Sequence, residues 1–496
     1  RLGVLGGANL FLLNPNGIVF GPAASLDVQG SFVASTSSAI PLGTTGLFSA
    51  TDPASSNLVD VQPNALFLNA LGNITNQATL QTEQDLTLIG NTVTNEGILQ
   101  AGQNLSLQAN TITSTGQLLA PNGAVTATAL TGNATIQQVD AQSATLSAAG
   151  NLALAGSQLT TTGNLTLQAQ NGVQISDAAA TPFNAAVGGN LTIQGNNSVN
   201  INILNSPTSS IQTTGNLNVA SPSGSIIANG IFNATGGVGF AAGQNLSLTS
   251  SQITATTGLT LAANGVLQIR DSATAAFTAT SGGNLLIQGN QGIDIQTVNP
   301  GSLLQSAGTL ILSSAGAVSS NIPVDAAGGL VINAGQDITF GNFTGPSLSL
   351  FTLGSIQIGA IDTSSTTGNG GAVSLIAGEV VQVGAINTSS SAAGGATGGN
   401  LSVAAGLDID IGTIDTSSDT GNGGAVTLAA NRNVTVASID SSSTAPALGN
   451  GGTVNITATT GNVLVTGAAT SINTSAIAGN AGGINVLAGG TATLDG

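Results

Sequence analysis

Apolar and polar residues alternate along most of the chain, in short runs bounded by glycine and asparagine. Similar units recur behind Gly or Gly-Asn, as in GNLTLQA at 163–169, GGNLTIQG at 188–195 and GGNLLIQG at 282–289. Within a unit the apolar residues lie two apart, as Leu165 and Leu167 do, which is the period of a strand with one buried face. The pattern predicts many short strands and little or no α-helix.

Two longer repeats are superimposed on these units. Residues 150–177 align with 244–271, and every aligned pair is 94 residues apart, which indicates a duplicated block. From about residue 356 a second repeat begins, of the form GxID[ST]S followed by a glycine-rich GNGGAV segment. Its isoleucines, spaced 25, 28 and 25 residues apart, are Ile361, Ile386, Ile414 and Ile439.

Periods of about 20–30 residues with strand patterning are typical of a solenoid, in which each coil buries its apolar face only against its neighbours. We therefore expect an all-β fold with an inner column of Leu, Ile, Val and Ala. Ser/Thr/Gly tracts such as 387–400 are predicted to be loops on one side of the coils. A β-propeller is the alternative fold, but it would favour regular blades of about 40–50 residues with aromatic side chains, and aromatic residues are 2% of the chain.

Asparagine precedes the first apolar residue of many units. Asparagine tolerates left-handed backbone in turns, and stacked amides can form ladders. Both roles are predicted for Asn104, Asn164, Asn190, Asn284 and Asn400.

Composition narrows the function. Hydrophobic residues make up 41% of the 496 residues, enough for a core, whereas charged residues make up 5% and the net charge is −17. Three cations, Arg1, Arg270 and Arg432, cannot form the basic patch that nucleic acid or an anionic membrane requires. The absence of Cys and His removes disulfides and the usual zinc and copper sites. No run approaches 18 apolar residues, so no membrane span is predicted. The sequence begins and ends within the repeat pattern, so we expect the chain to be a piece of a longer protein.

The segment Asn14-Pro15-Asn16-Gly17 interrupts two short apolar runs near the N-terminus. Proline fixes φ at the first corner of a turn, asparagine bonds the local backbone, and glycine accepts positive φ. These residues predict a tight turn between two strands. Turn chemistry alone indicates no function beyond that turn. Five of the twelve phenylalanines lie in the first 67 residues, which indicates a distinct N-terminal module: Phe11, Phe20, Phe32, Phe48 and Phe67.

The segment ANLFLLNPNGIVFGPAASLDVQGSFVAST, residues 8–36, resembles the N-terminal secretion domain of the filamentous haemagglutinin family, the two-partner secretion exoproteins of Gram-negative bacteria. The family's NPNGI motif corresponds to Asn14, Pro15, Asn16, Gly17 and Ile18, and the flanking residues resemble the form found in cyanobacterial large exoproteins. The resemblance covers about residues 1–80 and implies that the chain starts inside the secretion domain.

The resemblance further implies a right-handed parallel β-helix, exported through the outer membrane by a dedicated transporter, with the NPNGI region supporting folding and recognition of the secretion domain. We expect three segments: the C-terminal part of the secretion domain at 1–80, β-helix repeats with the 94-residue duplication at 81–355, and the GxID[ST]S/GNGGAV repeats at 356–496. The expected function is that of a secreted, surface-displayed adhesin or presenting stalk, without enzymatic activity or cofactor. Its ligand could be a carbohydrate or a protein on a host or cell surface.

A carbohydrate-active β-helix, lyase or hydrolase, is the main alternative, and a stalk for a separate C-terminal effector domain is another. An enzyme would need clustered carboxylates. Asp408 and Asp410 are the best candidate pair, for acid–base chemistry or a metal, because strand period places both on one face. The competing interpretation is a solvated outer face, with Ile409 and Ile411 pointing inward.

Other acidic residues recur in the repeats without forming such a pair. Asp177 and Asp271, the latter beside Arg270, occupy equivalent positions of the duplication and are interpreted as surface loop charges. One aspartate recurs in each GxID[ST]S unit, except where asparagine replaces it, which favours a turn role over catalysis; these residues are Asp362, Asn387, Asp415 and Asp440.

Overall fold

The computed structural model describes residues 1–4, 6–42, 45–57, 70–467 and 471–495, so Phe67 lies outside the described residues. The chain divides into two compact units, residues 1–244 and 245–496. The described residues of both units form strands, with one short 3-10 turn at Pro53–Ser55 and no α-helix. The predicted all-β class is confirmed, and each unit is a parallel β-helix.

Unit 1 contains short strands and two long ones, β12 and β13, which continue round corners of the coil. Its strands are β1 Leu2–Gly3, β2 Leu10–Leu13, β3 Ile18–Phe20, β4 Leu26–Asp27, β5 Phe32–Ser35, β6 Ala39–Leu42, β7 Gly46–Ser49, β8 Asn73–Asn76, β9 Thr79–Thr82, β10 Leu86–Asn95, β11 Ile98–Ala101, β12 Leu105–Ala129, β13 Ala134–Ala148, β14 Leu152–Ala155, β15 Gln158–Thr161, β16 Leu165–Ala169, β17 Gly172–Ser176, β18 Asn184–Val187, β19 Leu191–Gly195, β20 Ser198–Asn202, β21 Ser210–Thr213, β22 Leu217–Ser221, β23 Ser225–Asn229, β24 Ile231–Ala234 and β25 Val238–Ala242.

Unit 2 repeats the same kind of coil. Its strands are β26 Leu246–Thr249, β27 Gln252–Ala255, β28 Leu259–Ala263, β29 Val266–Arg270, β30 Thr278–Ser281, β31 Leu285–Gly289, β32 Gly292–Gln296, β33 Leu303–Ser306, β34 Leu310–Ser314, β35 Ala317–Ser320, β36 Val324–Ala326, β37 Leu330–Ala334, β38 Ile338–Phe340, β39 Phe343–Thr344, β40 Leu348–Thr352, β41 Ile356–Asp362, β42 Val373–Ala377, β43 Val381–Asn387, β44 Leu401–Ala405, β45 Ile409–Asp415, β46 Val426–Ala430, β47 Val434–Asp440, β48 Val454–Ala458, β49 Val463–Val465, β50 Ile472–Asn473, β51 Ile484–Ala488 and β52 Ala492–Leu494.

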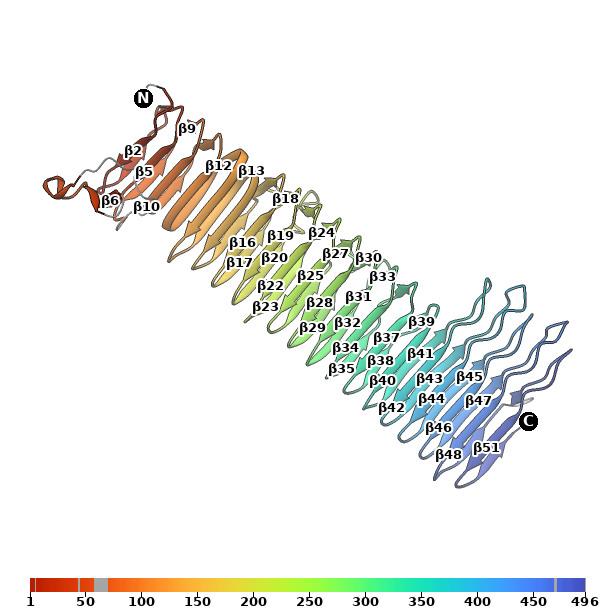
Figure 1. The fold of residues 1–496 in the computed structure, drawn as a ribbon. Coiled ribbons are helices and arrows are strands. Elements are labelled where there is room, and N and C mark those ends of the chain that lie inside the picture. Colours follow the sequence, from red (N-terminus) through yellow and green to blue (C-terminus); the bar gives the residue numbers. More distant parts are fainter. Residues whose placement is uncertain (5, 43–44, 58–69, 468–470, 496) are drawn as a thin grey trace. The chain divides into compact units, whose positions relative to one another are not determined.

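Parallel pairing stacks equivalent residues of successive coils (Figure 1). Leu165 pairs with Leu191, and Leu191 with Leu217, and all three side chains are fully buried. Parallel strands lie about 4.8 Å apart, so these residues form a continuous inner column. The predicted periods follow from this stacking.

The GxID[ST]S repeat also stacks as predicted. Its four isoleucines are paired in one line across β41, β43, β45 and β47. The tract at 388–400 and its counterparts leave the strands as loops, visible beyond the strand ends in cyan to blue (Figure 1). We call these loops, residues 363–372, 388–400, 416–425, 441–453 and 474–483, the loop wall. Isolated parallel bridges join the five loops, through Ser365, Ser390, Ser418, Ser443 and Ala476.

The asparagines at the coil corners form ladders from coil to coil. The prediction that their backbone is left-handed is wrong. The Oδ1 atom of Asn164 accepts a hydrogen bond from the backbone N–H of Asn190 at 2.8 Å, and Asn190 accepts one from Asn216 at 2.8 Å. Among described residues other than glycine, positive φ occurs at Ser250 and Leu448. The asparagine side chain binds the next coil's N–H, so it needs no left-handed conformation of its own.

Asparagines from both units make the same bond. Asn104, Asn284 and Asn400 accept hydrogen bonds from the N–H groups of Ala124, Thr309 and Ala425, at 3.1, 3.0 and 2.9 Å. The bond joins residues about one coil apart and fixes their register.

The aspartates of the GxID[ST]S units have the predicted turn role. Asp415 Oδ1 accepts a hydrogen bond from the backbone N–H of Ser417 at 2.9 Å. Equivalent bonds of 2.9–3.1 Å are made by Asp362, Asn387, Asp440 and Asn473. Because only the side-chain oxygen is used, asparagine can replace aspartate.

Asp177 and Asp271 are more than surface charges. Asp177 accepts hydrogen bonds from the N–H of Ser206 at 2.8 Å and from Ser209 Oγ at 2.7 Å. In the second copy of the duplication, Asp271 accepts bonds from the N–H of Asn299 at 2.9 Å and from Ser302 Oγ at 2.6 Å. Each carboxylate thus holds a loop of the following coil. Arg270 forms an ion pair with Asp294.

The two carboxylates make these loops sensitive to acid. Burial favours the neutral acid, but the hydrogen bonds to Ser209 and Ser302, with the neighbouring N–H bonds, outweigh burial and hold the pKa of Asp177 and of Asp271 below the ordinary value of 3.8. A carboxyl group whose pKa is lower in the folded than in the unfolded state stabilises the fold above 3.8. This contribution is lost as the pH falls through the lower, folded value.

We expect the double variant Asp177→Asn/Asp271→Asn to melt at lower temperature than wild type at pH 6, with the difference shrinking toward pH 2.5. Circular dichroism melting over this pH range measures it. Asp410→Asn is the control, because Asp410 is exposed and its side chain makes no hydrogen bond among the described residues. Equal melting temperatures of the double variant and wild type at pH 6 would contradict the expectation.

Candidate functional site

The turn at 14–17 connects β2 and β3 in unit 1 and has the predicted chemistry. The N–H of Gly17 donates to the carbonyl of Asn14 at 3.1 Å, which closes the turn, and Gly17 has φ +118°. The Asn14 side chain donates from Nδ2 to the carbonyl of Gly17 at 2.9 Å and accepts at Oδ1 from the N–H of Asn16 at 3.2 Å. Asn14 therefore holds the turn, while Pro15 occupies its first corner.

The turn packs directly on the backbone of residues 72 and 73. A Cβ atom added to Gly72 would lie 2.6 Å from both the nitrogen of Gly17 and the carbonyl oxygen of Pro15. A Cβ on Gly17 would lie 3.1 Å from the carbonyl oxygen of Asn73. The turn and this segment are thus in backbone contact that leaves no room for a side chain at residue 72.

Hydrogen bonds from the segment around Thr36 also hold Gly72 in place. Thr36, which is fully buried, donates from Oγ1 to the carbonyl of Gly72 at 2.8 Å, and its own carbonyl accepts from the N–H of Leu71 at 3.2 Å. Ser35 and Ser37 are also buried and hydrogen-bonded to each other at 2.8 Å. The GSFVAST segment therefore supports the turn, a role that sequence reasoning missed because Thr36 and Gly72 are 36 residues apart.

Apolar packing anchors the strand after the turn. Ile18 is buried, and the rings of Phe20 and Phe32 meet edge to face with centroids 6.1 Å apart. A hairpin of β6 and β7, which the sequence did not indicate, also belongs to this part of unit 1.

The outer edge of the turn is open to a partner. Asn16 is exposed and its side chain makes no hydrogen bond within the described residues. Val19, three residues on, is 73% exposed, and Phe11 on β2 is 38% exposed. An unbonded amide and exposed apolar side chains in one region of the domain are suited to protein recognition. The turn itself contains no titratable side chain.

The second candidate, Asp408 and Asp410, lies in unit 2. Ile409 and Ile411 are buried, as the outer-face interpretation requires, and Asp410 is exposed. Asp408 forms an ion pair with Arg432 and accepts bonds from the N–H and Nδ2 of Asn433, each at 3.0 Å.

The environment of Asp408 favours its ionised form. Burial raises the pKa of Asp408, but hydrogen bonds from Arg432 and Asn433 outweigh it and hold the pKa below its ordinary value. Within the described ranges, no three His, Cys, Asp or Glu side chains are grouped as a metal site would require.

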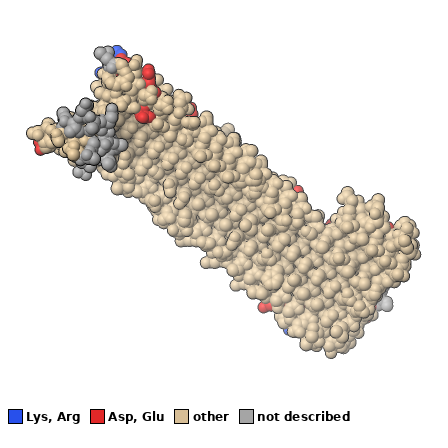
Figure 2. Space-filling view, in the orientation of Figure 1, with Lys and Arg blue, Asp and Glu red and all other residues tan. Residues whose placement is uncertain are grey.

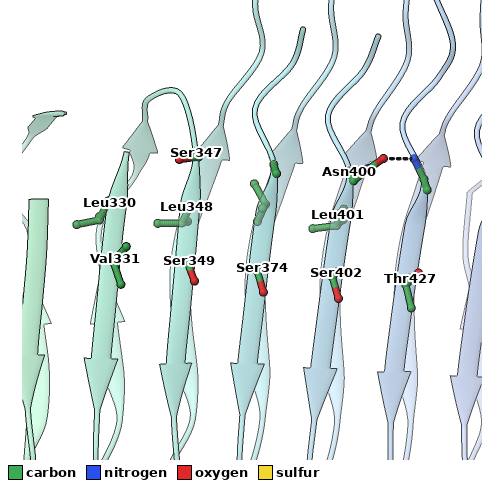
Figure 3. Close-up of a pocket in the computed structure, with 13 residues that line it drawn as sticks. Leu330, Val331, Ser347, Leu348, Ser349, Ser374, Asn400, Leu401, Ser402 and Thr427 are labelled. Atoms are coloured by element: carbon green, nitrogen blue, oxygen red, sulfur yellow. Dashed lines mark hydrogen bonds between the residues drawn. The ribbon is translucent and has the colours of Figure 1, made fainter. Parts of the chain in front are cut away.

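Two surface grooves lie on unit 2. One, of about 490 Å³, crosses β37, β40, β42, β44 and β46 and has no charged lining residue (Figure 3). The other, of about 470 Å³, is lined by Thr254, Thr280, Gln305 and their neighbours and contains one carboxylate, Asp325. Hydrolysis of a glycosidic bond normally needs two carboxyl groups, and neither groove contains a pair.

Comparison with protein families places the N-terminal turn and its supporting coils in one domain. The model of the TPS secretion domain matches residues 1–158. The match is consistent with a fragment of a two-partner secretion exoprotein. The domain includes the 14–18 motif, the GSFVAST segment and Gly72, and it extends past the first 80 residues on which the sequence resemblance rests. No curated protein and no solved structure matched the chain.

The TPS match indicates the general class of the protein. It implies a two-partner secretion exoprotein with a β-helical fold, exported through the outer membrane by a TpsB transporter. Across the described ranges, no helix has the length and apolar character needed to cross a bilayer.

Proposed function

We propose that the chain is displayed at the surface of a Gram-negative cell as an adhesin or presenting stalk of the filamentous haemagglutinin type. The observation that carries the proposal is the TPS domain at 1–158, followed by β-helical coils with few charges. Figure 2 displays a face on which charged side chains are sparse. Such coils suit display because many weak contacts along repeated units add by multivalency.

The proposed organisation keeps the segment boundaries at residues 80 and 355, giving 1–80, 81–355 and 356–496, and lets the secretion domain continue into the second segment as far as residue 158. Its secretion motif is Asn14, Pro15, Asn16, Gly17 and Ile18. The flanking residues favour an origin in a cyanobacterial large exoprotein. Within the motif we assign Asn14 and Gly17 to the turn's structure and Asn16 to recognition, because Asn14 makes the turn's side-chain bonds and Asn16 makes none.

The carbohydrate-active alternative would need a groove with paired acids. The two grooves of unit 2 contain no carboxylate and one carboxylate, respectively, and the carboxylate of Asp408 is already bound by Arg432 and Asn433. These observations favour a binding or presenting role without catalysis.

Surface labelling tests the proposal. The full-length gene, tagged near its C-terminus, is expressed in Gram-negative cells with and without the candidate TpsB transporter, and intact cells are labelled. We expect transporter-dependent surface signal that falls at least fivefold in both Asn14→Ala and Asn16→Ala.

The two variants separate folding from recognition. Asn14→Ala removes two hydrogen bonds and should cost about 1–2 kcal/mol of local stability. Asn16→Ala should leave melting of the purified chain unchanged, so its export defect would point to recognition. Equal surface signal with and without the transporter would contradict the proposal.

A further inference from the structure

A row of hydroxyl groups crosses the floor of the 490 Å³ groove. Ser349 on β40 pairs in register with Ser374 on β42, then Ser402 on β44 and Thr427 on β46. We call these four residues the hydroxyl row. Figure 3 shows them side by side on successive strands. All four side chains lie on the outer face, because the residues on either side of each are buried.

The hydroxyl row has no partner within the described residues, in contrast to the hydroxyls beside it. In the loop wall, Thr388 Oγ1 donates to the carbonyl of Gly399 at 2.7 Å, and Ser390 Oγ donates to the carbonyl of Gly368 at 2.7 Å. These two hydroxyl groups of the loop wall are thus bonded within the chain, whereas those of the groove are available to a ligand.

The loop wall forms one side of the groove. Three of its loops return to their strands at Ala372, Asn400 and Ala425, which all line the groove. Asn400 uses Oδ1 for the ladder bond to Ala425 at 2.9 Å (Figure 3). Its Nδ2 makes no other bond in the described structure and adds a donor at the groove's edge.

Apolar side chains lie two residues beyond the row on the same outer face. Phe351 follows Ser349 and is 45% exposed, and Ile376, its register partner on β42, is 44% exposed. A hydroxyl row beside an exposed aromatic ring matches the two kinds of surface on a sugar ring, its hydroxyl edge and its C–H face.

The charge of the surface limits the ligand. None of the residues lining this groove is charged, and the chain has a net charge of −17. Polyanions are therefore repelled at long range and find no cation in the groove. Uncharged ligands have no such barrier.

We propose that this groove binds a linear, uncharged polysaccharide whose chain crosses the strands along the hydroxyl row. Hydrogen-bonding groups repeated at the strand spacing of about 4.8 Å suit a polymer with a short repeat better than a single sugar. The inference rests on the proposed surface display, because it supplies the ligand class for an adhesin, but binding itself does not require export.

Affinity electrophoresis of the purified full chain tests this inference. Native gels contain hydroxyethyl cellulose, xylan or galactomannan as uncharged probes and polygalacturonate or alginate as anionic ones. We expect retardation by at least one uncharged probe and by neither anionic probe. Ser374→Ala/Ser402→Ala should weaken binding about tenfold, since two hydrogen bonds are lost.

Two further variants sharpen the result. Phe351→Ala should weaken binding by roughly threefold or more, whereas Thr260→Ala, an exposed hydroxyl outside both grooves, should leave it unchanged. Ser402, Phe351 and Thr260 are exposed, and Ser374 is half-buried with a hydroxyl group that makes no hydrogen bond among the described residues, so melting of all variants should match wild type. Absence of retardation by all uncharged probes, unchanged binding of the double variant, or tighter binding of an anionic probe would each overturn the inference. Surface labelling remains unaffected by these outcomes, so the two proposals fail separately.

Discussion

Gly72→Ala is expected to reduce TpsB-dependent surface signal to less than a tenth of wild type. The added Cβ would lie 2.6 Å from two backbone atoms of the turn, the nitrogen of Gly17 and the carbonyl oxygen of Pro15. A clash with a flexible side chain could relax by rotation, but these atoms belong to the backbone that closes the turn. The turn must therefore move, and backbone strain of this kind typically costs about 1–3 kcal/mol.

Gly21→Ala is the matched control for this prediction. Gly21 follows β3 in the same domain, and a Cβ there would meet no atom within 4 Å. We expect Gly21→Ala to be exported at the wild-type level. Surface labelling with and without the transporter measures both variants.

Thr36→Val tests the hydrogen bond that holds Gly72 without changing the packing around it. It removes the 2.8 Å bond from Oγ1 to the carbonyl of Gly72 but keeps the side chain's volume. We expect an intermediate export defect, because the Gly72 carbonyl loses one of its two hydrogen bonds, which typically costs about 0.5–1.5 kcal/mol. The N–H of Asn91 still donates to this carbonyl, at 2.8 Å. Wild-type export of Gly72→Ala would show that the contact between the turn and Gly72 is not needed.

The coils could be predicted from the sequence because their determinants are local and periodic. Leu165 and Leu167 alternate with polar residues and are both buried, and the spacings of Ile361, Ile386 and Ile414 are the lengths of successive coils. One apolar face per strand and one repeat per coil are sufficient to specify a stacked fold.

Contacts between distant residues could not be predicted in this way. The ladder bond from Asn190 to Asn164 spans 26 residues, and the bond from Ser209 to Asp177 spans 32. The preference of asparagine for turns predicts a left-handed backbone at these residues, which they do not have. The coil instead places each side-chain oxygen beside an N–H of the next coil, and that bond decides the conformation.

In the candidate site, too, local contacts could be predicted from the sequence and distant contacts could not. Turn chemistry correctly placed Asn14, Pro15 and Gly17, since their bonds are made within four residues. The roles of Thr36 and Gly72 depend on stacking of the turn over a later coil, and no local pattern reports it.

Gly399→Ala is expected to open the loop wall of unit 2. An added Cβ would collide with the carbonyl oxygen of Gly371 and lie 2.7 Å from its carbonyl carbon. Gly399 is buried, and its N–H and carbonyl bind the carbonyl and Oγ1 of Thr388, each at 2.7 Å. The loop cannot shift without breaking these bonds, so we expect a loss of about 2–3 kcal/mol in local stability.

Hydrogen exchange of the loop amides measures this loss, because local opening need not unfold the remaining coils. Gly368→Ala is the control within the same wall, since the nearest atom to its added Cβ is Ser365 Oγ at 3.9 Å. We expect its protection to stay within about 1 kcal/mol of wild type. Equal protection in the two variants would mean that the paired glycines of the GNGGAV repeat are not required by close backbone approach. If the prediction holds, the glycines of the repeat are required because the stacked backbones lie too close together for a side chain. Binding of a ligand is then not needed to explain why glycine occurs at these positions.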